Sequence, residues 1–319
     1  MRFEYRPYRR SFRQPLQTSH GVWTVREGII LRLTDDAGYV GFGEIAPLPW
    51  FGSETFEEAT EFCQQLPEVI SFDTIATIPA HLSACQFGFE SAQEMLGAEF
   101  SQSSALTHSA LLPTGHAALN GWKDLWEQGY RTFKWKIGVA EIKDEIQLFE
   151  QLIQTLPAEA FLRLDANAGL TFSQAETWLQ HCDSLSETDC HPTLEFLEQP
   201  LAVSQFDQMQ KLSQIYSTPL AIDESVATLD QLRECYQKGW RGIFVIKPAI
   251  VGSPSQLRKF CQETAIDAVF SSVFETAIGQ QAGLRLAAEL SLKNRAVGYG
   301  TSHWFDELME GGDRLWQSL

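Results

Sequence analysis

The sequence predicts an α/β fold in which a closed barrel of parallel strands follows a separate α+β module. Strand-like and amphipathic helical segments alternate from Ala105 onward, and polar or charged residues end five of these strands at intervals of roughly 30 residues, the spacing of a βαβ unit. No glycine-rich phosphate-binding turn opens the first unit, which favours a closed barrel over an open sheet. The 319 residues exceed the roughly 250 of a typical barrel and leave length for a second domain.

The sequence pattern of residues 1–95 predicts the α+β module. Three segments are strand-like: FEYRPY, VWTVREGIILRLTD and YVGFGEIAP. The turn DDAG joins the last two, and such a turn between runs of Val, Ile and aromatic residues indicates a hairpin. Residues 53–66 begin with a serine cap and place acidic residues in the first turn, so we expect a helix there. A further helical piece is expected at Ala80–Leu96. No alternation of strand and helix is present, which separates this module from the barrel.

Eight strands are expected in the barrel, residues 96–302. They lie at Ala105–Leu112, Thr132–Ile137, Phe161–Ala166, Leu194–Glu198, Leu220–Asp223, Gly242–Ile246, Ala268–Ser271 and Ala296–Tyr299. The stretches between them, such as KDEIQLFEQLIQTL and LDQLRECYQKG, have the apolar period of amphipathic helices. The tail, residues 303–319, has no strand pattern, and we expect it to pack back onto the N-terminal module.

Composition disfavours several classes of protein. The formal charge of −17 argues against a nucleic-acid partner, because phosphate binding needs a basic face. No apolar run approaches the ~18 residues of a membrane span, and no apolar segment follows the arginines at the N-terminus, so a cytoplasmic protein is expected. Those arginines predict either a solvated strand face or a contact to an anionic substrate tail. The six cysteines form no C-x-x-C pair, which predicts reduced, buried thiols.

Two lysines share one face of a predicted strand. Lys134 and Lys136 point one way, and Phe133, Trp135 and Ile137 point the other. An edge strand with a solvated lysine face is one interpretation. In a barrel, the apolar face packs on the helices and the lysines point into the interior. There, mutual repulsion and burial should lower the pKa of both lysines, and a lysine with a pKa near neutrality can act as a general base.

Three acidic residues, Asp165, Glu198 and Asp223, each close a predicted strand. Singly, each is explained equally well as a turn former or a helix N-cap. Together, at one rim of a narrow barrel, they would repel one another unless a cation lies among them. Oxygen ligands without His or Cys indicate Mg²⁺, with Mn²⁺ as the alternative. Asn167 faces the same side as Asp165 and is expected to hydrogen-bond a bound carboxylate.

Lys247 closes the sixth predicted strand. Around a ring, that strand stands opposite the second, so Lys247 would face Lys136 across the metal; an ordinary lysine near a loop is the other interpretation. A base, a metal ion and an opposing cation suit the removal of a proton α to a carboxylate, because the metal stabilises the enediolate that forms.

With these residues the sequence resembles the enolase superfamily, in the muconate-lactonizing-enzyme-like subgroup that has K-x-K on the second barrel strand and a lysine on the sixth. A lysine base beside Mg²⁺ is characteristic of this superfamily. The resemblance covers nearly the whole chain and implies a (β/α)7β TIM-like barrel below an α+β capping domain formed by both termini. It implies that Asp165, Glu198 and Asp223 are Mg²⁺ ligands, Lys136 the base, Lys134 the neighbour that tunes its pKa, and Lys247 the opposing lysine.

Within this subgroup, the segments GFGEIAPLP, FKWKIG, LRLDANAG, EFLEQP and VIKP are most similar to o-succinylbenzoate synthases of menaquinone or phylloquinone biosynthesis. The resemblance implies a hydro-lyase that converts a small cyclohexadiene carboxylate, 2-succinyl-6-hydroxy-2,4-cyclohexadiene-1-carboxylate, to 2-succinylbenzoate by syn-dehydration. Ser271 and Ser272 would meet the succinyl tail, or would be satisfied polar groups at a strand end. Arg163, one layer below Asp165, would bind substrate or be structural.

Other members of the subgroup have similar lysines and metal ligands. N-succinylamino acid racemases, dipeptide epimerases and muconate cycloisomerases therefore stay as alternatives. Dipeptide epimerases generally have D-x-D at the eighth strand, where this chain reads VGYGTSHW, which argues against an epimerase. A barrel that binds a ligand without turnover would not need an inward K-x-K. No oligomeric state is predicted.

Overall fold

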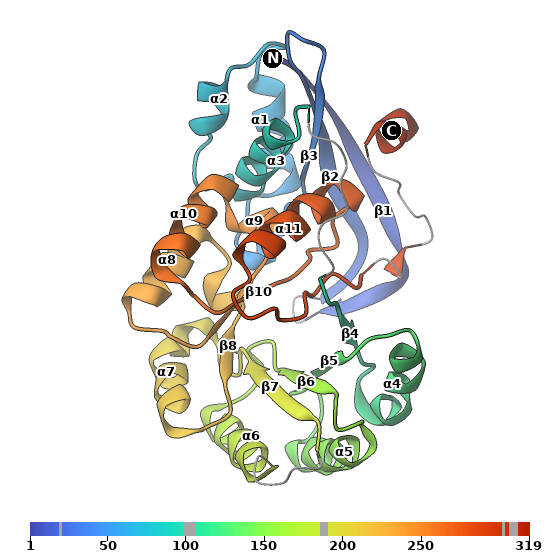
Figure 1. Cartoon of the computed structure of the whole chain (residues 1–319), viewed down its shortest axis with the longest axis vertical. Coiled ribbons are helices and arrows are strands. Elements are labelled where there is room, and N and C mark those ends of the chain that lie inside the picture. Colours follow the sequence, from blue (N-terminus) through green and yellow to red (C-terminus); the bar gives the residue numbers. More distant parts are fainter. Residues whose placement is uncertain (19–20, 98–105, 186–190, 302–303, 306–311) are drawn as a thin grey trace.

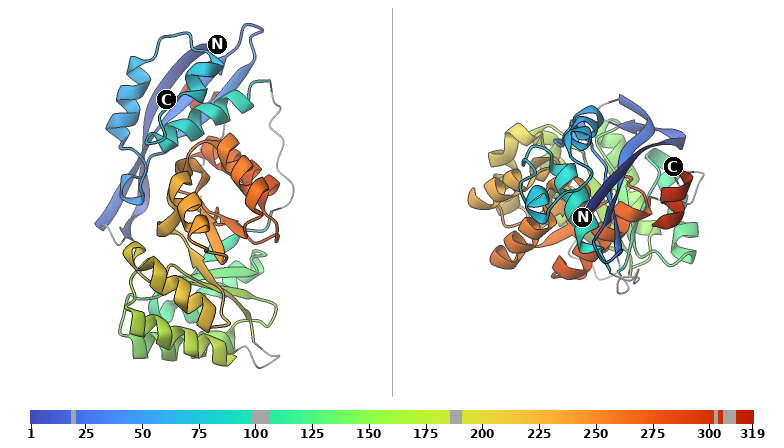
Figure 2. Two further views of the ribbon diagram at one scale, coloured as in Figure 1. Left: turned by 90° about the vertical axis from the view of Figure 1, so that its left-hand side faces the viewer. Right: turned by 90° about the horizontal axis from the view of Figure 1, so that it is seen from above.

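The structure is a computed structural model, and it describes residues 1–18, 21–97, 106–185, 191–301, 304–305 and 312–319. A three-stranded antiparallel sheet and its helices, called the cap below, lie over one end of a curled parallel sheet that is surrounded by helices (Figure 1). Both chain termini lie at the cap (Figure 2). No helix among the described residues is long and apolar enough to cross a membrane.

The cap sheet has the order β1-β2-β3, with strands Arg2–Thr18, Gly21–Thr34 and Val40–Ile45. The predicted hairpin turn is confirmed, because the Tyr39 amide donates to Asp35 Oδ1 at 2.9 Å. The predicted helix at residues 53–66 is shorter, since Thr55 rather than Ser53 is its N-cap and forms a capping box with Glu58. The cap helices are α1 Phe56–Gln65, α2 Phe72–Ala76 and α3 Ser83–Glu94.

The segment GFGEI, residues 41–45, presents different groups on its two faces. A Cβ atom at Gly41 or Gly43 would lie 2.0 Å from a carbonyl oxygen of helix α3, so only glycine lets the helix pack this closely on β3. Because side chains alternate along a strand, Phe42 and Glu44 point to the opposite face. Glu44 is fully buried there.

The parallel sheet has seven strands in the order β10-β9-β8-β7-β6-β5-β4. They are β4 Ser109–Leu111, β5 Thr132–Lys136, β6 Phe161–Asp165, β7 Thr193–Glu198, β8 Leu220–Ile222, β9 Ile243–Ile246 and β10 Ala268–Phe270. The helices are α4 Ala118–Glu127, α5 Ile142–Thr155, α6 Phe172–Leu185, α7 Phe206–Ile215, α8 Leu229–Gln237, α9 Pro248–Val251, α10 Pro254–Thr264 and α11 Ala277–Leu290. Seven predicted strands are thus found, six of them with small shifts at their ends. The first is much shorter than predicted, since only Ser109–Leu111 of Ala105–Leu112 is a strand, and Ala105 lies outside the described residues.

The eighth predicted strand, Ala296–Tyr299, forms only two single bridges. Val297 pairs with His108 before β4, and Gly298 pairs with Ser271 after β10. The amide of Ser109 donates to Val297 O at 2.9 Å, and the amide of Gly298 donates to Phe270 O at 2.8 Å. This short segment therefore joins the first and last strands and closes the barrel.

The apolar faces of the barrel strands pack against the helices, as the alternation in β5 predicts. Phe133 and Trp135 are buried, and the Trp135 ring makes an edge contact with Trp178 of α6 at a centroid distance of 6.3 Å. Lys134 and Lys136 consequently point into the barrel. The described cysteines are free and buried, as expected; Cys190 lies outside the described residues.

The C-terminal helix α12, Asp313–Ser318, packs on the cap. Its residues Leu315 and Trp316 form a buried cluster with Tyr8, Ile30, Phe42 and Ile278. Two of the N-terminal arginines, Arg6 and Arg10, lie over the rings of Trp316 and Phe305, 4.5 and 3.8 Å from the ring centroids. The strand of arginines is therefore partly covered by the C-terminal residues.

Candidate active site

Three buried carboxylates meet at the carboxyl end of the barrel. Asp165 and Glu198 are the last residues of neighbouring strands and pair in register, and Asp223 directly follows β8. Their exposed fractions are only 7%, 1% and 4%. Buried carboxylates are strongly disfavoured unless positive charge or hydrogen bonds compensate them, so this rim requires cations.

Two lysines supply positive charge at this rim. Lys134 Nζ lies 2.6 Å from Asp165 Oδ2 and 2.7 Å from Glu198 Oε1, and Lys247 forms an ion pair with Asp223. Within the described part of the chain, no three acidic, His or Cys side chains are arranged closely enough to hold a metal ion as they stand, because the carboxylates at this rim are paired with the lysines. The Lys134 ammonium instead takes the position of a cation between two carboxylates. The oxygen donors fit Mg²⁺, provided that Lys134 withdraws from them when the ion binds.

Lys136 differs from Lys134 in its partners. It pairs in register with Asp165 on the next strand, so its backbone lies beside the carboxylates. Its side chain is half-buried, and among the described residues it forms no hydrogen bond or ion pair. Lys136 is therefore the lysine whose amine is available to act on a ligand at the rim.

The pKa of one lysine at the rim, Lys134, differs from the expectation. Burial lowers the pKa of Lys134, but the negative charges of Asp165, Glu198 and Asp223 outweigh burial and hold it above its ordinary value. The prediction of a lowered pKa is therefore wrong for Lys134, because repulsion from a second lysine is weaker than attraction to three carboxylates. Burial, with the charge of Asp165, raises the pKa of Glu198 to about 8.

Glu224 is a fourth acid at this rim that the sequence reasoning missed. It begins the 3₁₀ helix η4, Glu224–Val226, directly after Asp223. Burial and the charge of Asp223 raise its pKa to about 7, and its Oε2 atom is buried without a hydrogen-bond partner. Asn167 donates from Nδ2 to Glu224 Oε1 at 3.3 Å and from its backbone amide to Asp165 Oδ1 at 3.0 Å. In the sequence, Glu224 could have been recognised as the second acid of the segment DES.

Gln199 connects the strands that carry two of the carboxylates. Its Oε1 accepts the amides of Asp223 at 3.0 Å and Ser225 at 3.3 Å, and its Nε2 donates to Leu201 O and to Ser225 Oγ, both at 2.9 Å. Its φ of 37° lies in the left-handed region. The side chain must donate and accept at the same time, which an amide can do and a carboxylate cannot.

The cap covers the rim with aromatic side chains. Phe51, in the 3₁₀ helix η1 Pro49–Phe51, places its ring 3.9 Å from Lys247 Nζ. Trp23 contacts Trp50 at a centroid distance of 4.9 Å and Phe274, in the loop after β10, at 5.6 Å. These residues were missed as site residues, although an aromatic PWF in a loop was a signal. Phe51 thus lies over the ammonium of Lys247, and the other three rings form one aromatic group that joins the cap to the loop after β10.

The two predicted serines follow β10 at the same rim. The Ser271 amide donates to Ile246 O at 2.9 Å, directly before Lys247, which places Ser271 beside that lysine. The Ser272 hydroxyl donates to Glu275 Oε2 at 2.8 Å and accepts the amide of Phe274 at 2.9 Å. Ser272 is therefore a satisfied polar group in this loop, and its role toward a substrate stays a prediction.

Arg163 lies inside the barrel, below the rim. It is 2% exposed, its Nε donates to Glu195 Oε2 at 2.6 Å, and its guanidinium lies 4.9 Å from the Phe196 ring centroid. Two residues along a strand rise roughly 6.6 Å, which places Arg163 one full layer below Asp165. This pairing favours the structural one of its two expected roles, and a contact to substrate stays a prediction.

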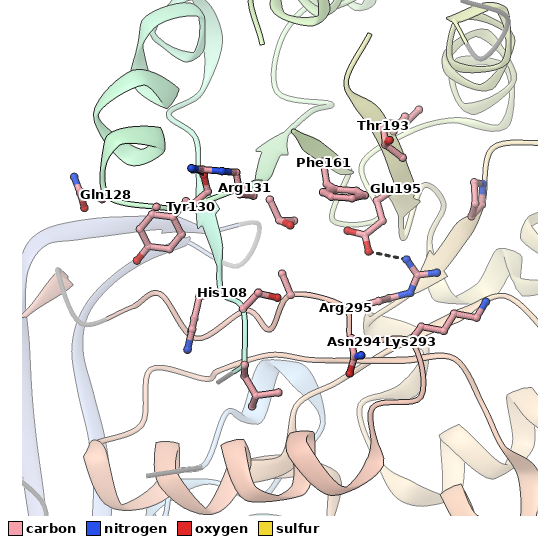
Figure 3. A pocket seen from close by; sticks show the side chains of 17 residues that line it. His108, Gln128, Tyr130, Arg131, Phe161, Thr193, Glu195, Lys293, Asn294 and Arg295 are labelled. Atoms are coloured by element: carbon pink, nitrogen blue, oxygen red, sulfur yellow. Dashed lines mark hydrogen bonds and ion pairs between the residues drawn. The ribbon is translucent and has the colours of Figure 1, made fainter. Parts of the chain in front are cut away.

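A cavity of about 1150 Å³ lies at the opposite end of the barrel (Figure 3). Its walls include residues at or just before the starts of several strands, among them Thr132, Phe161 and Thr193, and the ion pair between Glu195 and Arg295. None of the predicted catalytic or metal-binding residues lines it. In parallel barrels the chemistry lies at the carboxyl end of the strands, so the cavity is separate from the candidate site.

Comparisons with known proteins agree with this geometry. Residues 118–314 match the family described as enolase C-terminal domain-like, and residues 7–96 match the one described as MenC, N-terminal domain. The chain is 38% identical to the o-succinylbenzoate synthase of Thermosynechococcus vestitus over 100% of this chain and 99% of that protein.

Solved structures give the same grouping. The o-succinylbenzoate synthase of Thermosynechococcus elongatus, complexed with Mg in the active site, superposes with a TM-score of 0.92 at 37% identity and full coverage of both chains. The L-Ala-D/L-Glu epimerase of Bacillus subtilis superposes at 0.78 with 20% identity, over 98% of this chain and 92% of that one, and so shares the fold.

Proposed function

Since the chain belongs to the o-succinylbenzoate synthase family of the enolase superfamily, we propose that it dehydrates 2-succinyl-6-hydroxy-2,4-cyclohexadiene-1-carboxylate to 2-succinylbenzoate. The product would serve menaquinone or phylloquinone synthesis in the cytoplasm. Residues 1–95 with the tail would form the capping domain, and residues 96–302 the catalytic barrel.

The family to which the chain belongs supports the substrate, and the observation that carries the proposed mechanism is the division of charges at the carboxyl end of the barrel. Lys134 and Lys247 are paired with buried carboxylates, whereas Lys136 has no partner among the described residues and lies beside them. Asp165, Glu198 and Asp223 would hold Mg²⁺, with Mn²⁺ as a substitute. Mg²⁺ bound there would stabilise the negative charge that develops on the substrate carboxylate.

The lysines would move the proton. Lys136 would take the proton α to the ring carboxylate and return it to the departing hydroxyl on the same face, so that C–H and C–O bonds break and water leaves. Lys247 would hold its charge against the enediolate from the other face, with Phe51 shielding it from solvent. Lys134, released from Asp165 and Glu198, would place a positive charge beside Lys136 and lower its pKa.

Asn167 and Ser271 would help to position the substrate. The Asn167 side chain holds Glu224, and its backbone amide holds Asp165, so it fixes two acids at once. Ser271 lies beside Lys247 on the neighbouring strand, where the succinyl tail would extend.

A turnover assay tests the proposed function. Purified protein with Mg²⁺ should convert the cyclohexadiene carboxylate to the aromatic product, which is followed by absorbance, and EDTA should stop the reaction. L-Ala-L-Glu and an N-succinylamino acid, tested in parallel for a change in optical rotation, distinguish the epimerase and racemase alternatives. No aromatic product under saturating Mg²⁺ would refute the proposal, and faster racemisation of either alternative substrate would replace it with that activity.

A further inference from the structure

Glu44 of the cap is fully buried, yet it contacts the barrel rather than the cap core. Its carboxylate accepts the backbone amides of Thr276 at 2.9 Å and Gly279 at 3.0 Å, and also the hydroxyl groups of Thr276 and Tyr8. Thr276 and Gly279 belong to the first turn of α11, where free amides and the helix dipole favour a negative charge. One carboxylate thus connects strands β1 and β3 with the start of a barrel helix.

The surrounding backbone is shaped for this carboxylate. A Cβ atom at Gly279 would lie 2.9 Å from Glu44 Oε2, so a larger residue would push Glu44 away. On the cap side, a Cβ atom at Gly28 would lie 2.6 Å from the Tyr8 ring, so Gly28 gives Tyr8 the space to reach Glu44. Four donors around one buried group require a carboxylate, because an amide in this position would turn its own NH₂ toward some of them.

The helix start that Glu44 holds is also the end of the loop after β10. Within that loop, residues 271–276, Glu275 accepts the Ser272 hydroxyl at 2.8 Å and the Val273 amide at 2.6 Å. Phe274 has a φ of 63°, an unfavourable value for a non-glycine residue, which the surrounding contacts must maintain. Its ring makes edge contacts with Phe12 and Trp23 of the cap at 5.4 and 5.6 Å.

This loop borders the candidate active site. Ser271 lies beside Lys247 through the hydrogen bond to Ile246 O, and Phe274 belongs to the aromatic group that covers the rim. Movement of the start of α11 would therefore shift both the serine next to Lys247 and the aromatic cover. The metal-binding carboxylates lie on β6, β7 and after β8, and neither Glu44 nor the loop contacts them through any hydrogen bond in the described part of the chain.

We propose that Glu44 is a positioning residue for substrate binding: by holding the first turn of α11 against the cap, it fixes the loop 271–276 over the rim. The inference rests on the proposed function for its kinetic readout. Glu44 itself would touch neither the substrate nor the metal. Glu44 acts on the affinity for the substrate and not on proton transfer.

The test compares Glu44→Gln with Asp183→Asn. Asp183 provides a matched control, because it also accepts two backbone amides and a threonine hydroxyl, from Ser217 and Thr218, but at the opposite end of the barrel. In Glu44→Gln, KM for the cyclohexadiene carboxylate should rise about tenfold, with kcat changed less than about threefold, and the Kd of Mg²⁺ should not change. Asp183→Asn should lower Tm and leave KM unchanged.

Hydrogen exchange gives a readout that does not need turnover. The amides of residues 271–276 should exchange faster in Glu44→Gln and at the parental rate in Asp183→Asn. Tyr8→Phe, which removes one donor and keeps the ring, should show the same changes to a smaller degree and serves if Glu44→Gln does not fold. Parental KM and parental exchange in these variants would overturn the inference. A parent protein without turnover would refute the proposed function, while the exchange data would still decide the role of Glu44.

Discussion

Gln199 shows how a residue that touches no ligand can set the geometry of a site. It directly follows Glu198 at the end of β7, and its side-chain amide holds the backbone of Asp223 at the end of the neighbouring strand β8. The hydrogen bonds of the side chain explain the amide, because Leu201 O needs a donor that a carboxylate lacks.

Replacement of Gln199 by methionine should therefore weaken the metal site. The variant keeps the side-chain volume but leaves the buried Asp223 amide and Leu201 carbonyl without partners, which costs about 1–3 kcal/mol for each unsatisfied group. We expect the Kd of Mg²⁺, measured by calorimetry, to rise roughly 10- to 100-fold. Gln180→Met on the exposed surface of α6 is the control. An unchanged Kd in Gln199→Met would show that Asp223 needs no such support.

The location of the charged residues was easier to predict from the sequence than the ion pairs that they form. Strand alternation and spacing located Lys134, Lys136, Asp165, Glu198 and Asp223 at one rim. They did not reveal that Lys134 pairs with two of the acids, since ion pairs depend on side-chain conformations across strands. Glu224 was overlooked because a single acid after Asp223 carries no periodic signal.

At the scale of elements, the loop between β10 and α11 contains a second buried carboxyl group. Burial, with the charge of Glu44 nearby, raises the pKa of Glu275 to about 7. A raised pKa in the folded protein means that the stability contribution is fully present below the ordinary value of 4.5 and is lost as pH rises through about 7. Alkaline conditions should therefore loosen this loop.

The free energy of unfolding should accordingly fall between about pH 5 and pH 8.5, and Glu275→Gln should remove part of that fall, roughly 3 kcal/mol at most. Urea unfolding at several pH values, with saturating Mg²⁺ in every sample so that the acids at the metal site stay ionised, measures the difference. Glu263→Gln, on the exposed face of α10, should keep the parental pH dependence. If the free energy of unfolding of Glu275→Gln depended on pH as in the parent, Glu275 would not be the group that titrates in this range.

Elements with strong periodic patterns were predicted best. The six strands β5 to β10 match their predicted ranges closely because their apolar faces are continuous, whereas β4 is much shorter than predicted. The eighth was predicted as a strand but forms only two bridges, since it is short and contains Gly298 between the first and last strands. The docking of α3 on Gly41 and Gly43 required the three-dimensional structure, because a glycine in a strand does not identify the helix that approaches it.

In the whole molecule, the cap and the barrel both contribute residues to the candidate active site. The barrel provides the carboxylates and lysines, and the cap provides Phe51 over Lys247, aromatic rings over the rim and Glu44 at the start of α11. The alternation of strands and helices predicted the barrel. The contacts between cap and barrel join residues that are far apart in the sequence, 232 positions for Glu44 and Thr276, and no local pattern in the sequence specifies them.

The central claim is that Lys136 moves the proton at a site where Asp165, Glu198 and Asp223 hold the metal. It is tested most directly by measuring turnover of the cyclohexadiene carboxylate and the Kd of Mg²⁺ in Lys136→Ala, with Lys143→Ala on the exposed face of α5 as the matched control. We predict that Lys136→Ala loses at least about 10²- to 10⁴-fold in kcat while binding Mg²⁺ as tightly as the parent. Turnover by Lys136→Ala at the rate of the parent and of Lys143→Ala would contradict the account.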